Sequence, residues 1–262
     1  MLFHTMFTTR PSTKKHAAKF SKDVKRTGHR PQLETLEDRL VPSVADGAVL
    51  VCSAPSFFSA QDQSSYPTGI IAVDPSTGEQ AAVSTGGLFS LPTYIAEGSD
   101  GTLYVTDLGQ LDSTGNPLPN TGSIIKVDPN RANGANQILL VSGLNGPNAI
   151  TIVNGLLYVA NLGDSTGLVH EIVQIDPTTG REHVISQNGG EGFSVPTGVT
   201  AGIGNTIYVA DEPGNVQGAD PGAIWEVNLD TGKQTLIAHG GLLDHPSDLA
   251  TAPNGDLLVG NT

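Results

Sequence analysis

Residues 196–211 read PTGVTAGIGNTIYVAD, and the stretches IWEVNLDTG at 224–232 and KQTLIA at 233–238 complete a unit that recurs along the chain. Related strings, such as LYV and LLV, bring five valines into register at spacings of 54, 54, 50 and 50 residues: Val51, Val105, Val159, Val209 and Val259. A period near 50 residues is typical of a repeat architecture, so the fold follows from the structure of one unit.

Each complete unit contains four short apolar runs separated by turn residues. Runs rich in Val, Ile, Leu and Tyr and bounded by Gly, Asn, Asp or Pro are typical of strands. The first run of the later units begins at a proline: Pro92, Pro147, Pro196 and Pro246. An aspartate recurs at the end of the third run, and the aligned residues are Asp74, Asp128, Asp176 and Asp230. Dipeptides such as Asn154-Gly155 tolerate positive φ and predict a tight turn between the first and second strands. A D-P-x-T-G turn, with Gly78, Gly180 or Gly232 in the left-handed position, joins the third strand to the fourth.

This pattern predicts an all-β fold for residues 47–262, a β-propeller of four-stranded antiparallel blades. Most runs are apolar at consecutive positions, which suits sheets that are covered on both faces, as stacked blades are. The first blade has only strands two to four, three complete blades follow, and the last contains only its first two strands. We therefore expect an incomplete propeller of about four to five blades: a truncated gene product, an open arc, or a part that closes against another chain.

Residues 1–46 differ from the rest in charge. Residues 1–40 hold nine basic and four acidic side chains, whereas the remainder holds four basic and 22 acidic ones. Such asymmetry predicts a largely disordered targeting segment ahead of a folded domain. The segment RPQLETLEDRLVPS at 30–43 resembles a short motif near the N-terminus of many predicted exported or surface proteins of planctomycete bacteria. This resemblance implies export or cell-surface location, and the alternative is a charged amphipathic stretch in a cytoplasmic protein.

Composition excludes several classes of function. With 13 Lys and Arg against 26 Asp and Glu, the formal charge of −13 argues against a nucleic-acid partner. No apolar run approaches the roughly 20 residues that a transmembrane helix needs. The single cysteine, Cys52, cannot form an intrachain disulfide, and no zinc-ligand spacing is present.

The residues at 196–211 and 224–232 also resemble a known family. They look like the blade of NHL-repeat proteins and, more broadly, like the six-bladed TolB-like propellers of the gluconolactonase and streptogramin-lyase group. That resemblance implies a divalent cation in the central channel, with Asn148 and Asp248 at positions similar to two of the group's ligands. The group's early glutamate has no counterpart, and the fold hosts enzymes and binding scaffolds alike.

The residues themselves suggest further candidates for ligand binding. An oxygen-bearing residue follows each aligned valine by two positions: Ser53, Asp107, Asn161, Asp211 and Asn261. Equivalent positions lie at the same end of successive blades, so this ring of residues could bind Ca²⁺, a sugar or a lactone. The alternative is that each side chain caps its own strand. Tyr94 and His245 are predicted beside the channel, and acid–histidine neighbours such as Asp244-His245 are expected to point to opposite faces of a strand.

Three hypotheses about function remain open at this point. The first is an exported, non-enzymatic propeller that binds a protein or carbohydrate partner. The second is a metal-dependent lactonase-like or lyase-like enzyme that uses Asn148 and Asp248. The third is a truncated propeller fragment without independent function.

Overall fold

The computed structural model describes residues 47–54, 67–163, 169–187, 192–212 and 222–261. Within these ranges the chain forms seventeen strands in three four-stranded, one three-stranded and one two-stranded antiparallel sheet. No helix that is long and apolar enough to cross a membrane is found among these residues. The predicted leader at 1–46 lies outside the described residues.

Each sheet corresponds to one predicted blade. Blade 1 is β1 (Val49–Ser53), β2 (Gly69–Val73) and β3 (Gln80–Thr85), and blade 2 is β4 (Pro92–Glu97), β5 (Leu103–Asp107), β6 (Gly122–Val127) and β7 (Gln137–Leu144). Blade 3 is β8 (Pro147–Val153), β9 (Leu156–Asn161), β10 (Glu171–Ile175) and β11 (Glu182–Gln187). Blade 4 is β12 (Val195–Ala201), β13 (Thr206–Glu212), β14 (Ala223–Asn228) and β15 (Gln234–His239), and blade 5 is β16 (Pro246–Thr251) with β17 (Leu257–Asn261).

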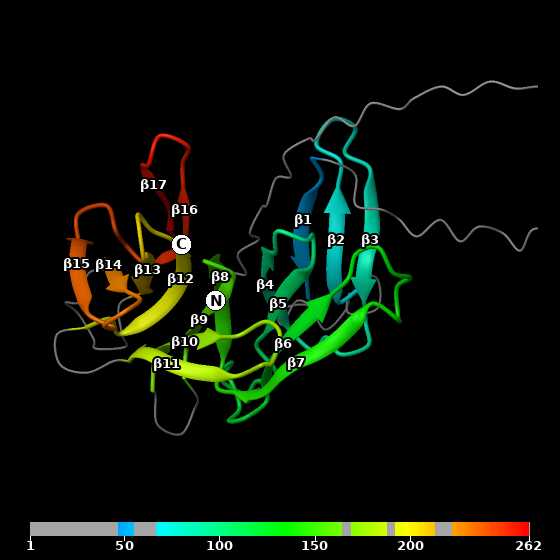
Figure 1. Cartoon of the computed structure of the whole chain (residues 1–262), viewed down its shortest axis with the longest axis horizontal. Helices are drawn as coiled ribbons and strands as arrows, with labels where there is room; N and C mark the ends of the chain where they lie inside the picture. Colours follow the sequence, from blue (N-terminus) through cyan, green and yellow to red (C-terminus); the bar gives the residue numbers. More distant parts are fainter. Residues whose placement is uncertain (1–46, 55–66, 164–168, 188–191, 213–221, 262) are drawn as a thin grey trace, which may run out of the picture.

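The blades follow one another around an open arc, from β1–β3 in blue and cyan to β16–β17 in red (Figure 1). Strand order within each sheet is sequential, and the first strands β4, β8, β12 and β16 pack against one another near the middle of the arc. The prediction of an all-β propeller with an incomplete first and last blade is therefore confirmed.

The core lies between neighbouring sheets. One cluster of buried side chains joins blades 2, 3 and 4, and a second joins blades 1 and 2. The aligned residues Val105, Val159 and Val209 are all fully buried, as strands covered on both faces require.

The turns between third and fourth strands show why the D-P-x-T-G string recurs. Asp74 Oδ1 accepts the amide of Ser76 at 2.7 Å, and Asp176 makes the same contact in blade 3. The glycine that ends each turn has positive φ, 74° at Gly78 and 71° at Gly180. The alignment of Asp230 with these aspartates was wrong by two residues, because Asn228 Oδ1 accepts the turn amides in blade 4.

A β-bulge lies at the start of every first strand. The pairing register with the second strand shifts directly after the opening proline in β4, β8, β12 and β16. The extra residue of each bulge is Thr93, Asn148, Thr197 or Ser247. Because bulges redirect a side chain out of the normal strand alternation, these positions can contact a neighbouring blade.

Candidate functional site

The bulge residues tie the first strands together around the centre of the arc. Thr93 Oγ1 donates to the carbonyl oxygen of Asn148 at 2.8 Å, and Asn148 Nδ2 donates to the carbonyl oxygen of Thr197 at 2.6 Å. Thr197 Oγ1 in turn donates to the carbonyl oxygen of Pro246 at 2.7 Å. Each contact reaches from one blade to the next, so the bulge residues brace blades 2 to 5 against one another.

Tyr94 connects two blades that are not neighbours. Its hydroxyl donates to the carbonyl oxygen of Ser247 at 3.0 Å, which links blade 2 to blade 5. Burial raises the pKa of the Tyr94 phenol, and the nearby charges of Asp248 and then Cys52 raise it further. The phenol therefore remains protonated at neutral pH and keeps its donor role. Burial also raises the pKa of the Cys52 thiol, with Asp107 as the second cause.

The two predicted metal ligands lie on strands that are separated by β12. Asn148 uses Nδ2 for the contact with Thr197, and Asp248 Oδ1 accepts the amide of Leu249 at 2.7 Å. Within the described ranges, no three His, Cys, Asp or Glu side chains are grouped in a way that could hold a metal ion. The metal-binding role of Asn148 and Asp248 stays a prediction.

Asp107, in the predicted ring, holds the segment that leads into the first strand of its own blade. Its carboxylate accepts the amides of Ser90 at 2.7 Å, Leu91 at 3.1 Å and Gly109 at 3.0 Å. The side chain is almost fully buried, and burial raises the pKa of Asp107 even though these amides act in the opposite direction.

Asp211 repeats this arrangement in blade 4. Its Oδ1 accepts the amides of Ser194 at 2.7 Å and Val195 at 2.6 Å, while its Oδ2 accepts Trp225 Nε1 at 3.0 Å. In blades 2 and 4, therefore, a buried carboxylate accepts two consecutive backbone amides where the chain enters the first strand. The sequence signal for it is the string F-S-x-P-T, at 89–93 and 193–197, followed by the ring aspartate. The strand and turn patterns of the sequence do not predict this contact.

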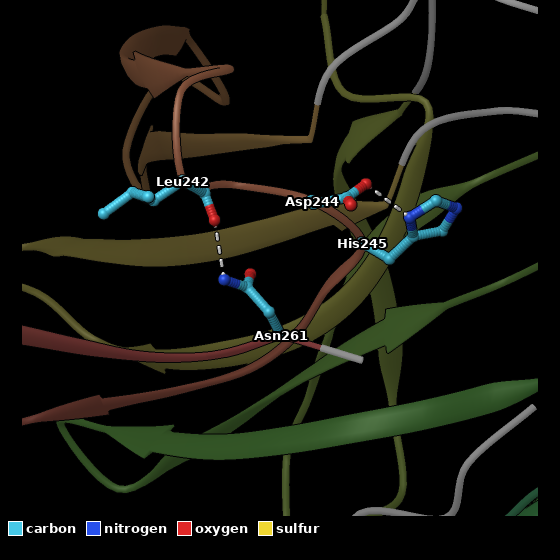
Figure 2. A network of polar contacts seen from close by, with 4 residues as sticks. All are labelled: Leu242, Asp244, His245 and Asn261. Atoms are coloured by element: carbon cyan, nitrogen blue, oxygen red, sulfur yellow. Dashed lines mark hydrogen bonds and ion pairs between the residues drawn. The ribbon is translucent and has the colours of Figure 1, made fainter.

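Blades 3 and 5 carry asparagine in the ring and use it differently. Asn161 Nδ2 donates to Glu171 Oε1 at 3.1 Å, and Asn261 Nδ2 donates to the carbonyl oxygen of Leu242 at 2.8 Å (Figure 2). In the described part of the structure, Asn161 Oδ1 and His170 Nδ1 are the buried side-chain atoms that lack a hydrogen-bond partner. Asp107 caps its own strand through the amide of Gly109, whereas these contacts of Asp211 and Asn261 reach segments 14 to 19 residues away in the sequence. A ligand-binding role for the ring, including Ser53 at the end of β1, stays a prediction.

A second set of residues that the sequence patterns did not single out connects the outer strands. Gln137 Oε1 accepts the amide of Leu88 at 2.7 Å, and its Nε2 donates to Ser84 Oγ at 2.9 Å in blade 1. Gln234 makes the equivalent pair of contacts, with the amide of Phe193 and with Ser186 Oγ of blade 3. Each glutamine begins the fourth strand of its blade and joins that blade to the preceding one.

Asp244 and His245 form a polar pair directly before β16, the first strand of blade 5 (Figure 2). His245 Nδ1 lies 2.9 Å from Asp244 Oδ1, and both side chains are at least half exposed. The expectation that these neighbours point to opposite faces was wrong, because both precede β16 and lie in a turn. His245 has a φ of 54°, whereas blade 3 has Gly146 with a φ of 67° at the equivalent position before proline.

Replacing His245 with glycine is expected to raise the free energy of unfolding by about 1 kcal/mol. A side chain in the left-handed region costs roughly that amount, and glycine removes the cost. The lost contact with Asp244 is solvent-exposed and contributes little. Urea unfolding of the wild type and His245→Gly measures the difference, and a less stable variant would show that the His245 side chain contributes more than its backbone strain costs.

Comparison with known proteins supports the fold. No family model matches the sequence, and no curated protein sequence matches it. Among solved structures, the chain is similar to one in the crystal structure of a nidogen/laminin complex, with a TM-score of 0.59 and 17% sequence identity. The similarity covers 84% of this chain and 69% of that chain. At this level of identity the likeness shows a shared propeller fold and does not extend to activity.

Proposed function

We propose that this protein is a non-enzymatic β-propeller scaffold that binds a protein partner outside the cell. The observation that carries the proposal is that the polar side chains near the centre of the arc form hydrogen bonds with the backbone. The side chains of Thr93, Asn148 and Thr197 donate hydrogen bonds to backbone carbonyl oxygens of the neighbouring blade. Asp107 and Asp211 receive backbone amides. Residues used in this way give a rigid arrangement of blades, which is what a recognition surface requires.

Three further observations support the proposal. The similar solved chain comes from a crystal structure of a nidogen/laminin complex, in which two proteins are assembled. The motifs resemble NHL-repeat proteins, which belong to a fold that hosts many binding scaffolds. The segment at 30–43 resembles the leader of exported proteins. A carbohydrate is the second partner class that suits an exported propeller, and it is an outcome of the test below.

The test compares binding with catalysis on the full 262-residue chain. Native mass spectrometry with and without Ca²⁺, followed by a panel of lactones, examines the enzymatic alternative with Asp248→Ala as the matched variant. In parallel, the purified chain is tested against extracellular proteins and glycans, and any protein partner found is purified and titrated. We expect saturable binding of a protein and no lactone turnover. Turnover that requires a bound cation and disappears in Asp248→Ala would overturn the proposal, as would saturable binding of a glycan alone.

A further inference from the structure

A groove of about 670 Å³ lies between the outer strands of blades 3 and 4. Its lining includes Ile185, Ser186 and Gln187 of β11, together with Gly232 and Gln234 of blade 4. Blades 3 and 4 each contain four strands, so neither side of this groove belongs to an incomplete blade.

The interface between blades 1 and 2 has the same construction, but there the end of the outer strand is covered. Ser84 and Thr85 of β3 hold the register positions that Ser186 and Gln187 hold in β11. The amide of Thr85 donates to Asn133 Oδ1 at 2.8 Å, and Asn133 Nδ2 donates to Thr85 Oγ1 at 2.7 Å. Because Asn133 belongs to the turn between β6 and β7, blade 2 supplies the asparagine that covers the end of blade 1.

The corresponding turn of blade 4 is too short to do the same. The backbone hydrogen bond that closes the turn spans 128–136 in blade 2 but only 228–233 in blade 4, which leaves no residue at the position of Asn133. The carbonyl oxygen of Gly232 accepts Ser186 Oγ at 2.9 Å. The shorter turn therefore serves the serine of β11, and the position after it has no equivalent of the asparagine.

The exposure of β11 agrees with the missing cover. Val83 is 3% exposed, whereas Ile185 at the same position of β11 is only partly buried. Thr85 is partly buried, whereas Gln187 is exposed. Backbone groups at a given register position of an antiparallel pair point either into the sheet or out of it. Since the Thr85 amide points out of the sheet toward Asn133, the shared register directs the Gln187 amide into the groove.

We propose that the groove between blades 3 and 4 is a docking site for an asparagine-bearing turn of a partner protein. In the complex, the asparagine Oδ1 of the partner accepts the amide of Gln187. A side-chain carboxamide suits this position because it carries an acceptor and a donor side by side, and Asn133 uses both on Thr85. The inference rests on the proposed partner-binding function and adds to it the surface and the chemistry of the partner.

A cyclic peptide that copies the turn of blade 2, residues 128–137 (DPNRANGANQ), is the probe. We titrate it into the full 262-residue chain labelled with ¹⁵N and follow the backbone amides by NMR. The amide of Gln187 should shift in a saturable way, and the amide of Thr85 should not, because Asn133 of the chain already covers it. Gln187→Pro, which removes the N–H at an edge position where proline is tolerated, should weaken binding by roughly two- to tenfold.

Two peptide variants provide a test that does not depend on the folding of Gln187→Pro. Asn133→Ala in the peptide should weaken binding about tenfold, since it removes both contacts of the carboxamide. Asn130→Ala is the matched control and should bind like the parent, because the contacts of Asn130 lie within its own turn, with Asp128.

Several results would overturn the inference. They are a Gln187 amide that does not shift, equal weakening by the two peptide variants, and equal shifts at Gln187 and Thr85. Slow hydrogen exchange of the Gln187 amide in the free chain would also overturn it, because the chain itself would then fill the groove. A protein partner that binds Gln187→Pro as tightly as the wild type would leave the scaffold function standing and remove this docking site.

Discussion

Replacing Gly232 with alanine is expected to lower the free energy of unfolding by about 2–4 kcal/mol. Gly232 ends the turn between β14 and β15 with a φ of 68°, a conformation that costs an alanine about 1 kcal/mol. A Cβ at this position would also overlap the carbonyl oxygen of Ile185 in β11 of the preceding blade. Overpacking against backbone typically adds about 1–3 kcal/mol. Urea unfolding followed by tryptophan fluorescence measures the sum, because Trp225 lies in the same blade.

Gly78→Ala is the matched control for this prediction. Gly78 ends the same type of turn in blade 1 with a φ of 74°, and a Cβ added there would meet no described atom within 4 Å. The control should therefore show only the backbone cost of about 1 kcal/mol. Equal losses in Gly78→Ala and Gly232→Ala would mean that blade 4 does not pack its turn against blade 3.

The architecture of the blades could be predicted from sequence because each strand and turn is specified by residues close together in the chain. Asn154-Gly155 forms a two-residue turn between β8 and β9, and Gly180 ends the turn between β10 and β11 with the expected positive φ. These preferences belong to individual residues and dipeptides, so they repeat with the period. The incomplete first and last blades followed from the same count of strands.

The polar contacts between blades could not be predicted in the same way. Gln234 contacts Ser186, and Asn148 contacts Thr197, each across nearly 50 residues of sequence. The repeat period shows that these positions recur but does not show which backbone groups they contact. The ring illustrates the same limit, because aspartate and asparagine at equivalent positions were grouped as one set of oxygen-bearing residues. In the structure, Asp107 and Asp211 accept backbone amides, whereas Asn161 and Asn261 donate a hydrogen bond to an oxygen atom.

Asp211→Asn is expected to lower the free energy of unfolding by about 2–3 kcal/mol, although it changes only one atom of the side chain. In the wild type, Oδ1 accepts the amides of Ser194 and Val195, and Oδ2 accepts the indole N–H of Trp225. Whichever oxygen becomes an amide nitrogen, a donor then faces a donor. Loss of a hydrogen bond to a charged group, with a buried donor left unsatisfied, typically costs about that much.

The matched control for Asp211→Asn is Asp230→Asn in the same blade. Asp230 is exposed and accepts Asn205 Nδ2 at 2.8 Å through a single oxygen, Oδ1, so an asparagine side chain can keep this contact. We expect Asp230→Asn to change stability by less than about 0.5 kcal/mol.

The asparagines of blades 3 and 5 place their amide nitrogens against acceptors, at Glu171 Oε1 and the carbonyl oxygen of Leu242. If Asp211→Asn were as stable as the wild type in urea unfolding, the segment before β12 would have to tolerate asparagine as the segments of blades 3 and 5 do. The carboxylate would then be available for a role beyond holding its own blade.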